Sequence, residues 1–137
     1  MKTRPLLLSS FIVGLSLVVA PVVTTSPVWA ASSLIEILDG DKDHTLDLDE
    51  VRKAAAAVYD RLEKDHDSTL DRKEVGSRIN GKEFSASDPD HDGTLSKDEY
   101  FALAEKLFKK ADINGDGTLN SKELHSKAGR ALARLLR

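Results

Sequence analysis

Four 12-residue segments of the chain share one pattern and recur at nearly constant spacing. They are DGDKDHTLDLDE (39–50), EKDHDSTLDRKE (63–74), DPDHDGTLSKDE (88–99) and DINGDGTLNSKE (112–123), named loops 1 to 4 in chain order, and their starts lie 24, 25 and 24 residues apart. Each has an acidic residue at position 1, Asp or Asn at 3, Asp at 5, Thr at 7, Leu at 8 and Glu at 12. One such match could arise by chance in a chain that is 31% charged, but four in register indicate an internal repeat.

The pattern places oxygen atoms where a short loop can wrap around a hard cation. Calcium takes six to eight oxygen ligands at about 2.3–2.6 Å, and a 12-residue loop supplies them from side chains at positions 1, 3 and 5, a carbonyl at 7 and a two-oxygen Glu at 12. Position 6 favours Gly because the chain turns there with positive φ. A hydrophobic residue at position 8 can join two loops through a short β-bridge, and all four loops have Leu there: Leu46, Leu70, Leu95 and Leu119.

Loops 3 and 4 fit the motif D-x-[DN]-x-[DN]-G-x5-E completely, with Gly93 and Gly117 at position 6. On these residues the sequence resembles the EF-hand calcium-binding proteins of the calmodulin superfamily, and more closely the small exported EF-hand proteins of bacteria. The resemblance covers nearly all of residues 31–137 and implies Ca²⁺ as the bound ion. It also implies that Ser96 and Asn120, at position 9, act through water.

The resemblance gives a ligand set for each loop. In loop 1 the candidates are Asp39, Asp41, Asp43, Thr45, Asp47 and Glu50; in loop 2, Glu63, Asp65, Asp67, Thr69, Asp71 and Glu74; in loop 3, Asp88, Asp90, Asp92, Thr94 and Glu99; in loop 4, Asp112, Asn114, Asp116, Thr118 and Glu123. The threonines contribute backbone carbonyls. Loop 1 has His44 at the Gly position, and loop 2 has both Glu63 at position 1 and Ser68 at position 6. A non-Gly residue at positive φ costs about 1 kcal/mol, so we expect loop 1 to bind more weakly than loops 3 and 4, and loop 2 to bind most weakly.

The segments between the loops predict an all-α fold, an array of helix-loop-helix units. Apolar residues recur at helical spacing in 51–62, 100–111 and 124–136, and 33–38 forms a short entering helix. Asn80-Gly81 is a turn signal that divides 75–87 into two short helical pieces. Only 12, 13 and 12 residues separate the loops, so one helix serves as both exit and entrance. Consecutive loops would then lie at opposite ends of a shared helix, and we expect non-sequential pairing, such as loop 1 with loop 3 or loop 2 with loop 4.

Residues 1–30 differ from the rest of the chain. A basic start at Lys2 and Arg4 precedes an apolar run, and the small-residue pattern ending at Ala30 suits cleavage before Ala31. This layout predicts a secretory signal peptide followed by an EF-hand domain over 31–137, and hence an exported protein, periplasmic or secreted. An uncleaved membrane anchor is the alternative. The chain has no Cys, so disulfides cannot stabilise the domain, and bound metal is the expected substitute.

These features favour a non-enzymatic calcium-binding protein that acts as a buffer or a metal-stabilised module. The alternative is a calcium sensor that exposes an apolar surface to an unidentified protein partner. We expect no nucleic-acid partner and no membrane contact after cleavage. The basic residues after Glu123 suit either an ordinary exit helix with its leucines in the core or an amphipathic helix that binds anionic lipid. The four His residues do not indicate a transition-metal site.

Overall fold

The computed structural model describes residues 31–137. Its helices are α1 (Ala31–Leu38), α2 (Leu48–Leu62), α3 (Arg72–Val75), α4 (Gly81–Ser85), α5 (Lys97–Ala111), α6 (Ser121–Leu124) and α7 (Lys127–Leu135), with a 3₁₀ turn η1 (Gly76–Arg78). Its strands are β1 (Leu46–Asp47), β2 (Thr69–Leu70), β3 (Leu95–Ser96) and β4 (Thr118–Leu119). The predicted helical fold is confirmed for these residues, with two small sheets added. The predicted signal peptide lies outside them.

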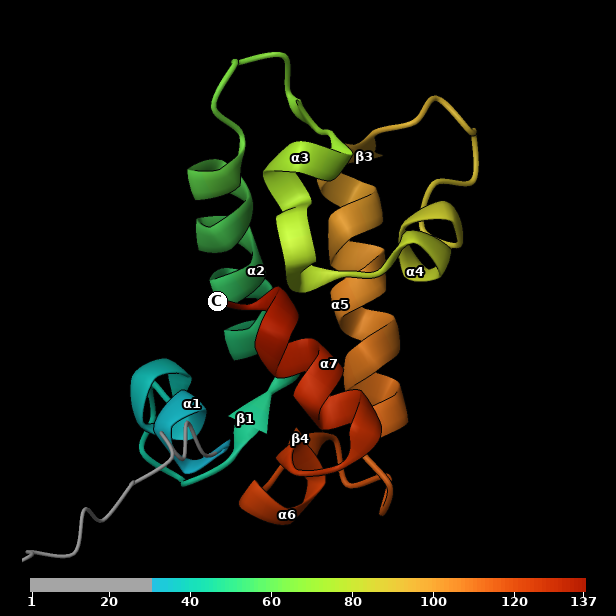
Figure 1. Ribbon diagram of the computed structural model, residues 1–137. Coiled ribbons are helices and arrows are strands. Elements are labelled where there is room, and N and C mark those ends of the chain that lie inside the picture. Colours follow the sequence, from blue (N-terminus) through green and yellow to red (C-terminus); the bar gives the residue numbers. More distant parts are fainter. Residues whose placement is uncertain (1–30) are drawn as a thin grey trace, which may run out of the picture.

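Two long helices, α2 and α5, form the centre of the domain and run antiparallel (Figure 1). Each has 15 residues and therefore extends about 22 Å. The rings of Tyr59 and Tyr100 meet edge to face between them, with centroids 5.7 Å apart. Surface ion pairs link the same two helices: Lys97 Nζ lies 2.8 Å from Asp60 Oδ1, and Arg52 contacts Glu105 at 3.2 Å. The apolar faces predicted for α2 and α5 are buried in one core, except that Phe101 is only partly covered.

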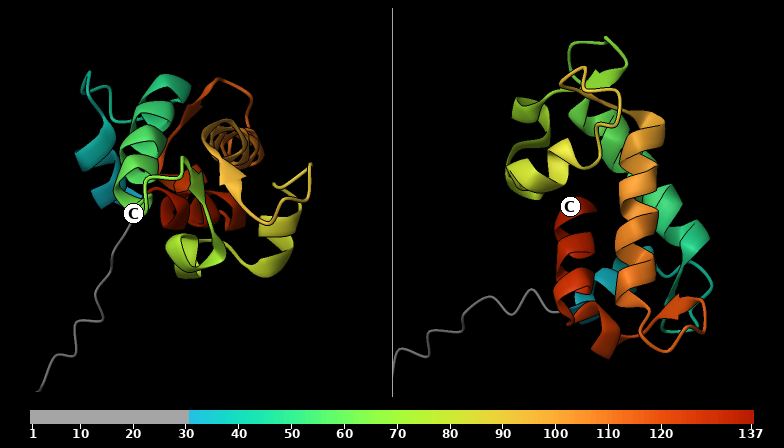
Figure 2. Two further views of the ribbon diagram at one scale, coloured as in Figure 1. Left: turned by 90° about the horizontal axis from the view of Figure 1, so that it is seen from above. Right: turned by 90° about the vertical axis from the view of Figure 1, so that its right-hand side faces the viewer.

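The antiparallel arrangement decides which loops meet. Loop 1 precedes α2 and loop 4 follows α5, so these two loops lie at one end of the domain, while loops 2 and 3 lie at the other (Figures 1 and 2). At the first end β1 pairs with β4, with Leu46 opposite Leu119. At the second β2 pairs with β3, with Leu70 opposite Leu95. All four leucines are fully buried.

The prediction of loop pairing is therefore partly right. Loops 3 and 4 do lie at opposite ends of the shared α5, and loops 1 and 2 at opposite ends of α2, as expected. The suggested pairs 1 with 3 and 2 with 4 are wrong, because they would require α2 and α5 to be parallel. Loops 2 and 3 pair although they are consecutive, since α3, η1 and α4 between them fold back at Asn80, which caps α4 by accepting hydrogen bonds from Lys82 N and Glu83 N.

The last predicted helix, 124–136, is interrupted. Helix α6 ends at Leu124, and Ser126 starts α7 by accepting a hydrogen bond from Gly129 N at 3.0 Å. Gly129 allows the two helices to pack closely, because a Cβ there would lie 2.3 Å from the carbonyl oxygen of Glu123. Helix α7 then runs back along α5, with Leu132 and Leu135 fully buried. Its apolar stripe thus belongs to the core, as expected of an ordinary exit helix.

Candidate metal centres

Each loop ends in the same hydrogen-bonded cap, which explains the residues at positions 9 and 12. The position-9 side chain is the N-cap of the helix that follows and accepts from the N–H of the Glu at position 12; these N-caps are Asp47, Asp71, Ser96 and Asn120. In return the Glu accepts the position-9 N–H through Oε2, at 3.0 Å in loop 1, 3.1 Å in loops 2 and 4, and 2.8 Å in loop 3. This capping box fixes the carboxylate and leaves its other oxygen, Oε1, to face the loop.

Backbone donors also orient the side chains at positions 1 and 5. The position-1 carboxylate accepts the position-6 N–H in all four loops, at 2.9 to 3.2 Å. The position-5 carboxylate accepts both the N–H and the hydroxyl of the Thr at position 7, at 2.7 to 2.9 Å. These bonds hold the position-1 and position-5 carboxylates against the backbone of their own loop. The Thr at position 7 therefore helps to shape the loop through its own donors, a role that the motif alone does not reveal.

Three groups of carboxylates converge closely enough to hold one cation. In each group the candidate ligand atoms all lie within 4.8 Å of one another: Asp39, Asp41 and Asp43 in loop 1; Glu63, Asp65 and Asp67 in loop 2; and Asp88, Asp90 and Glu99 in loop 3. Loop 4 has an amide at position 3, and Asn114 Nδ2 donates to Asp116 Oδ2 at 2.7 Å. Only in loop 3 does the group include the Glu at position 12.

One oxygen in loop 3 shows that the group suits a cation. Asp88 is only 6% exposed, and its Oδ1 is buried without a hydrogen-bond partner among the described residues. A buried carboxylate oxygen without a donor is costly unless a cation satisfies it. The atoms that converge with it are carboxylate oxygens of Asp90 and Glu99, and oxygens are the ligands of hard cations such as Ca²⁺. The residues of loop 3 therefore fit a bound calcium ion.

Repulsion between like charges is visible at the exposed position-3 residues. The pKa of Asp90 is raised: the N–H of Asp92 lowers it, but desolvation and the negative charges of Asp92 and Glu99 outweigh that effect. The pKa of Asp41 is raised in the same way. The hydrogen bond from the N–H of Asp43 lowers it, but desolvation and the negative charge of the Asp43 side chain outweigh that effect. A cation between these groups would relieve the repulsion.

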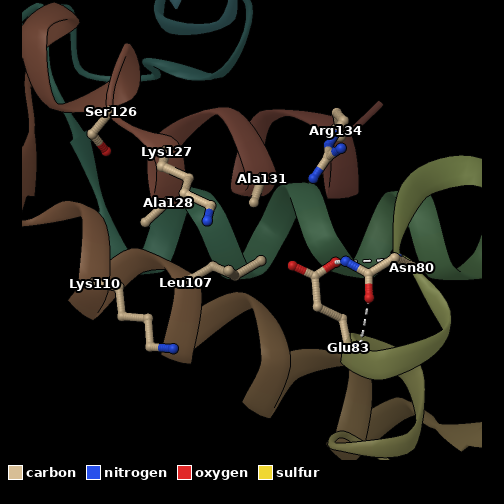
Figure 3. Close-up of a pocket in the computed structure, with 9 residues that line it drawn as sticks. All are labelled: Asn80, Glu83, Leu107, Lys110, Ser126, Lys127, Ala128, Ala131 and Arg134. Carbon is tan, nitrogen blue, oxygen red and sulfur yellow. Dashed lines mark hydrogen bonds between the residues drawn. The ribbon is translucent and has the colours of Figure 1, made fainter.

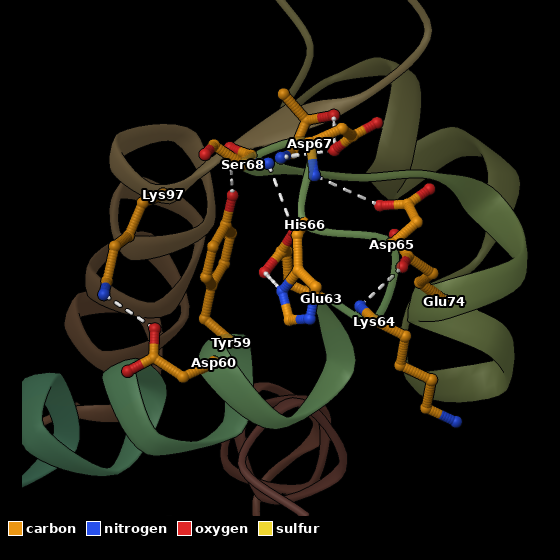
Figure 4. Close-up of polar contacts among 11 residues, drawn as sticks. Tyr59, Asp60, Glu63, Lys64, Asp65, His66, Asp67, Ser68, Glu74 and Lys97 are labelled. Carbon is orange, nitrogen blue, oxygen red and sulfur yellow. Dashed lines mark hydrogen bonds and ion pairs between the residues drawn. The ribbon is translucent and has the colours of Figure 1, made fainter.

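Loop 2 keeps the hydrogen bonds that the other loops form at positions 1, 5 and 12 despite its substitutions, and Figure 4 shows its polar contacts. The longer Glu63 side chain still reaches the position-6 N–H, at 3.2 Å from Ser68 N, and its other oxygen lies 3.6 Å from His66 Nδ1. The hydroxyl of Tyr59 donates to the carbonyl of Ser68 at 2.8 Å and lies 3.4 Å from the carbonyl of Leu95 in loop 3. The extra methylene of Glu63 is thus accommodated without displacing the carboxylate.

The backbone of loops 1 and 2 is strained where the sequence predicts it. His44 and Ser68, at position 6, have φ of 67° and 69°. Position 4 also has positive φ, at Lys42, His66 and His91, which the loop motif does not predict. Gly115 occupies position 4 in loop 4, so that loop alone has Gly at both left-handed positions.

A separate cleft of about 680 Å³ lies between α7, α5 and the start of α4 (Figure 3). Its lining consists of Asn80, Glu83, Leu107, Lys110, Ser126, Lys127, Ala128, Ala131 and Arg134. Three of these side chains are cationic, but the carboxylate of Glu83 lies among them, held by Asn80 N and Nδ2 at 3.2 and 2.8 Å. None of the candidate ligands is part of this cleft. Within residues 31–137, no helix is both long and apolar enough to span a bilayer.

Comparison with known proteins agrees with this geometry. The family model of the EF hand matches residues 103–126, which include the second half of α5, loop 4 and α6. No curated protein matches the sequence. The match and the acidic groups in the loops together support an EF-hand protein that binds calcium.

Proposed function

We propose that this protein binds calcium ions through all four loops and acts outside the cytoplasm as a calcium buffer or metal-stabilised module. The proposed ligands are the 22 loop residues named from the sequence, at positions 1, 3, 5, 7 and 12 of every loop and at position 9 of loops 1 and 2. The observation that carries the proposal is the buried, unpartnered Oδ1 of Asp88 in a carboxylate group with Asp90 and Glu99.

The loop residues account for how binding would couple to folding. Backbone N–H groups and threonine hydroxyls hold the carboxylates close together, which is unfavourable while all of them are charged. A bound calcium ion supplies two positive charges and removes this cost. Because the position-12 Glu is also part of the helix cap, ligand binding holds the first turn of the following helix in place. Stability should therefore rise with calcium concentration.

The closed core favours a buffer or structural role over a sensor. Residues 31–137 have a formal net charge of −5, which four calcium ions would change to +3. The large hydrophobic side chains exposed in the described part of the chain are Ile37 and Ile113, while the leucines of α7 are buried. Neither isoleucine lines the cleft beside α7. A large apolar surface for a partner would thus require the helices to open.

Isothermal titration of the purified protein with CaCl₂, with MgCl₂ as the control, tests the proposal. We expect saturable calcium binding, a rise in melting temperature with calcium, and no increase in the fluorescence of an apolar dye. Absence of binding at millimolar calcium would refute calcium binding, and a calcium-dependent rise in dye fluorescence would support the sensor.

Export is tested separately. Expression of the full sequence in a host with a secretory pathway should yield a protein that begins at Ala31, as measured by intact mass. A product that retains residues 1–30 would contradict cleavage.

A further inference from the structure

The second residue of each loop determines what the position-12 Glu can do. In loop 1 the N–H of Gly40 donates to Glu50 Oε1 at 2.6 Å, and in loop 2 the N–H of Lys64 donates to Glu74 Oε1 at 3.0 Å (Figure 4). In both loops, therefore, Oε1 of the position-12 Glu, the oxygen that does not take part in the cap, accepts a hydrogen bond from the position-2 N–H. Correspondingly, neither Glu belongs to the carboxylate group of its loop.

Loop 4 shows the same contact. The N–H of Ile113 lies 3.2 Å from Glu123 Oε1, and the N–H of Asn114 lies 3.4 Å from the same atom. Both oxygens of Glu123 therefore accept hydrogen bonds from the backbone, and the two donors at Oε1 compete with a cation for that oxygen.

Loop 3 has proline at position 2. Pro89 has no N–H, and no hydrogen bond to Glu99 Oε1 is formed among the described residues. Its Oε2 still accepts from Ser96 N and Oγ, at 2.8 and 2.9 Å, so the cap is intact. Glu99 is then the one position-12 carboxylate that joins a group of converging ligands, beside Asp88 with its unpartnered Oδ1.

We propose that Pro89 is a positioning residue that prepares loop 3 for calcium, because it removes the backbone donor that holds the position-12 Glu in the other loops. The inference rests on the proposed calcium binding and deepens it. Loop 3 need not break a hydrogen bond to Glu99 Oε1 when it binds, so it fills at the lowest calcium concentration of the four. The β2–β3 pair and α5 then connect this first occupied loop to loops 2 and 4.

The first test is Pro89→Ala in the full-length protein, with calcium binding followed at individual loop amides by ¹H–¹⁵N NMR. The new N–H should donate to Glu99, and loop 3 should lose on the order of tenfold in calcium affinity, as expected for one hydrogen bond to a charged group. An unchanged midpoint for Gly93 and Thr94 would overturn the proposal.

Hydrogen exchange separates the donor from the stiffness of proline. In calcium-free Pro89→Ala the amide of residue 89 should exchange as slowly as those of Lys64 and Ile113, because Glu99 accepts it. A weaker loop 3 with rapid exchange at residue 89 would assign the effect to backbone rigidity and overturn the role given to the missing donor. This measurement needs no calcium, so it distinguishes failure of the inference from failure of the proposed function.

The reciprocal variant is Lys64→Pro, with Lys64→Ala as the matched control for loss of the lysine charge. Glu63 precedes it with φ −69° and ψ 100°, an extended conformation that tolerates a following proline. Loop 2 of Lys64→Pro should bind calcium on the order of tenfold more tightly than loop 2 of Lys64→Ala. Equal or weaker binding in a folded Lys64→Pro protein would contradict the proposal.

Discussion

The two ends of the domain are built alike, and each joins a regular loop to an irregular one. At one end loop 4, with Gly117 at position 6, pairs with loop 1, which has His44 there; at the other, loop 3 with Gly93 pairs with loop 2 and its Ser68. The ends differ in how the irregular loop is held. Tyr59 connects loops 2 and 3 through its hydroxyl, whereas α1 packs against α6 and α2 at the end of loops 1 and 4. The more altered loop, loop 2, is thus the one with an added side-chain tether.

The largest expected effect comes from breaking one β-bridge. Leu119 and Leu95 are both fully buried at the centres of their bridges. Leu119→Ala and Leu95→Ala should each reduce the free energy of unfolding by about 2–5 kcal/mol, through lost burial and a residual cavity. Urea denaturation in saturating calcium measures both. A loss below about 1 kcal/mol for either variant would show that its end does not depend on the bridge.

A smaller effect is expected where glycine replaces the strained residue of an irregular loop. His44→Gly and Ser68→Gly should tighten calcium binding of loops 1 and 2 by about fivefold each, since relief of left-handed strain is worth about 1 kcal/mol. Residue-resolved NMR titration provides the midpoints. The control is His44→Ala, which removes the imidazole but keeps a Cβ. If alanine tightens loop 1 as much as glycine does, the imidazole and not the backbone is responsible.

An effect of about the same size is expected at the tether of loops 2 and 3. Tyr59→Phe removes the donor to Ser68 O, and should cost about 1 kcal/mol of stability. Tyr100→Phe removes the buried bond to Leu135 O instead, and should leave calcium binding by loop 2 unchanged. If calcium binding by loop 2 weakens in Tyr100→Phe but not in Tyr59→Phe, the Tyr59 hydroxyl does not tether loop 2 to loop 3.

Tyr59 also makes the stability of the folded domain depend on pH. Desolvation, followed by the charges of Glu63 and Asp67, raises the pKa of Tyr59 from 10.0 to about 12. Because the folded state favours the neutral phenol, the stabilisation is complete below pH 10 and is lost as the pH rises through 12. Desolvation also raises the pKa of Tyr100 to about 12, so both tyrosines contribute. Between pH 10 and 12, Tyr59→Phe should lose less stability than the unmodified chain in urea denaturation; an equal loss would contradict the shift at Tyr59.

The helices and the loop positions could be predicted because they depend on patterns of residues close together in the sequence. Helical periodicity located α2 and α5, and the turn at Asn80 was predicted from Asn-Gly alone. The strain at His44 and Ser68 followed from their position in the loop. These features depend on neighbours within a few residues, which a pattern can show.

The rest depends on contacts between distant segments. Shared helices were predictable from the spacing, but whether α2 and α5 run parallel or antiparallel depends on contacts between residues far apart in the chain, such as Tyr59 and Tyr100, so the pairs suggested from the sequence were wrong. The break before α7 was marked by Ser126, an ordinary N-cap residue that the continuous apolar pattern of 124–136 obscured. The role proposed for Pro89 needed the position-2 contacts of the other three loops for comparison.

The most direct test of the account is the effect of losing one regular loop on the other three. Glu99→Gln and Glu123→Gln each remove the position-12 carboxylate of a regular loop, and should weaken that loop by at least about 100-fold, more than the loss of an outer-sphere contact. Calcium midpoints of every loop are then compared by NMR. Because loop 2 pairs with loop 3 and loop 1 with loop 4, we expect Glu99→Gln to weaken calcium binding by loop 2 more than by loop 1, and Glu123→Gln to do the reverse. If Glu99→Gln weakens calcium binding by loop 4 but leaves calcium binding by loop 2 unchanged, the loops are not coupled through the β1–β4 and β2–β3 pairs.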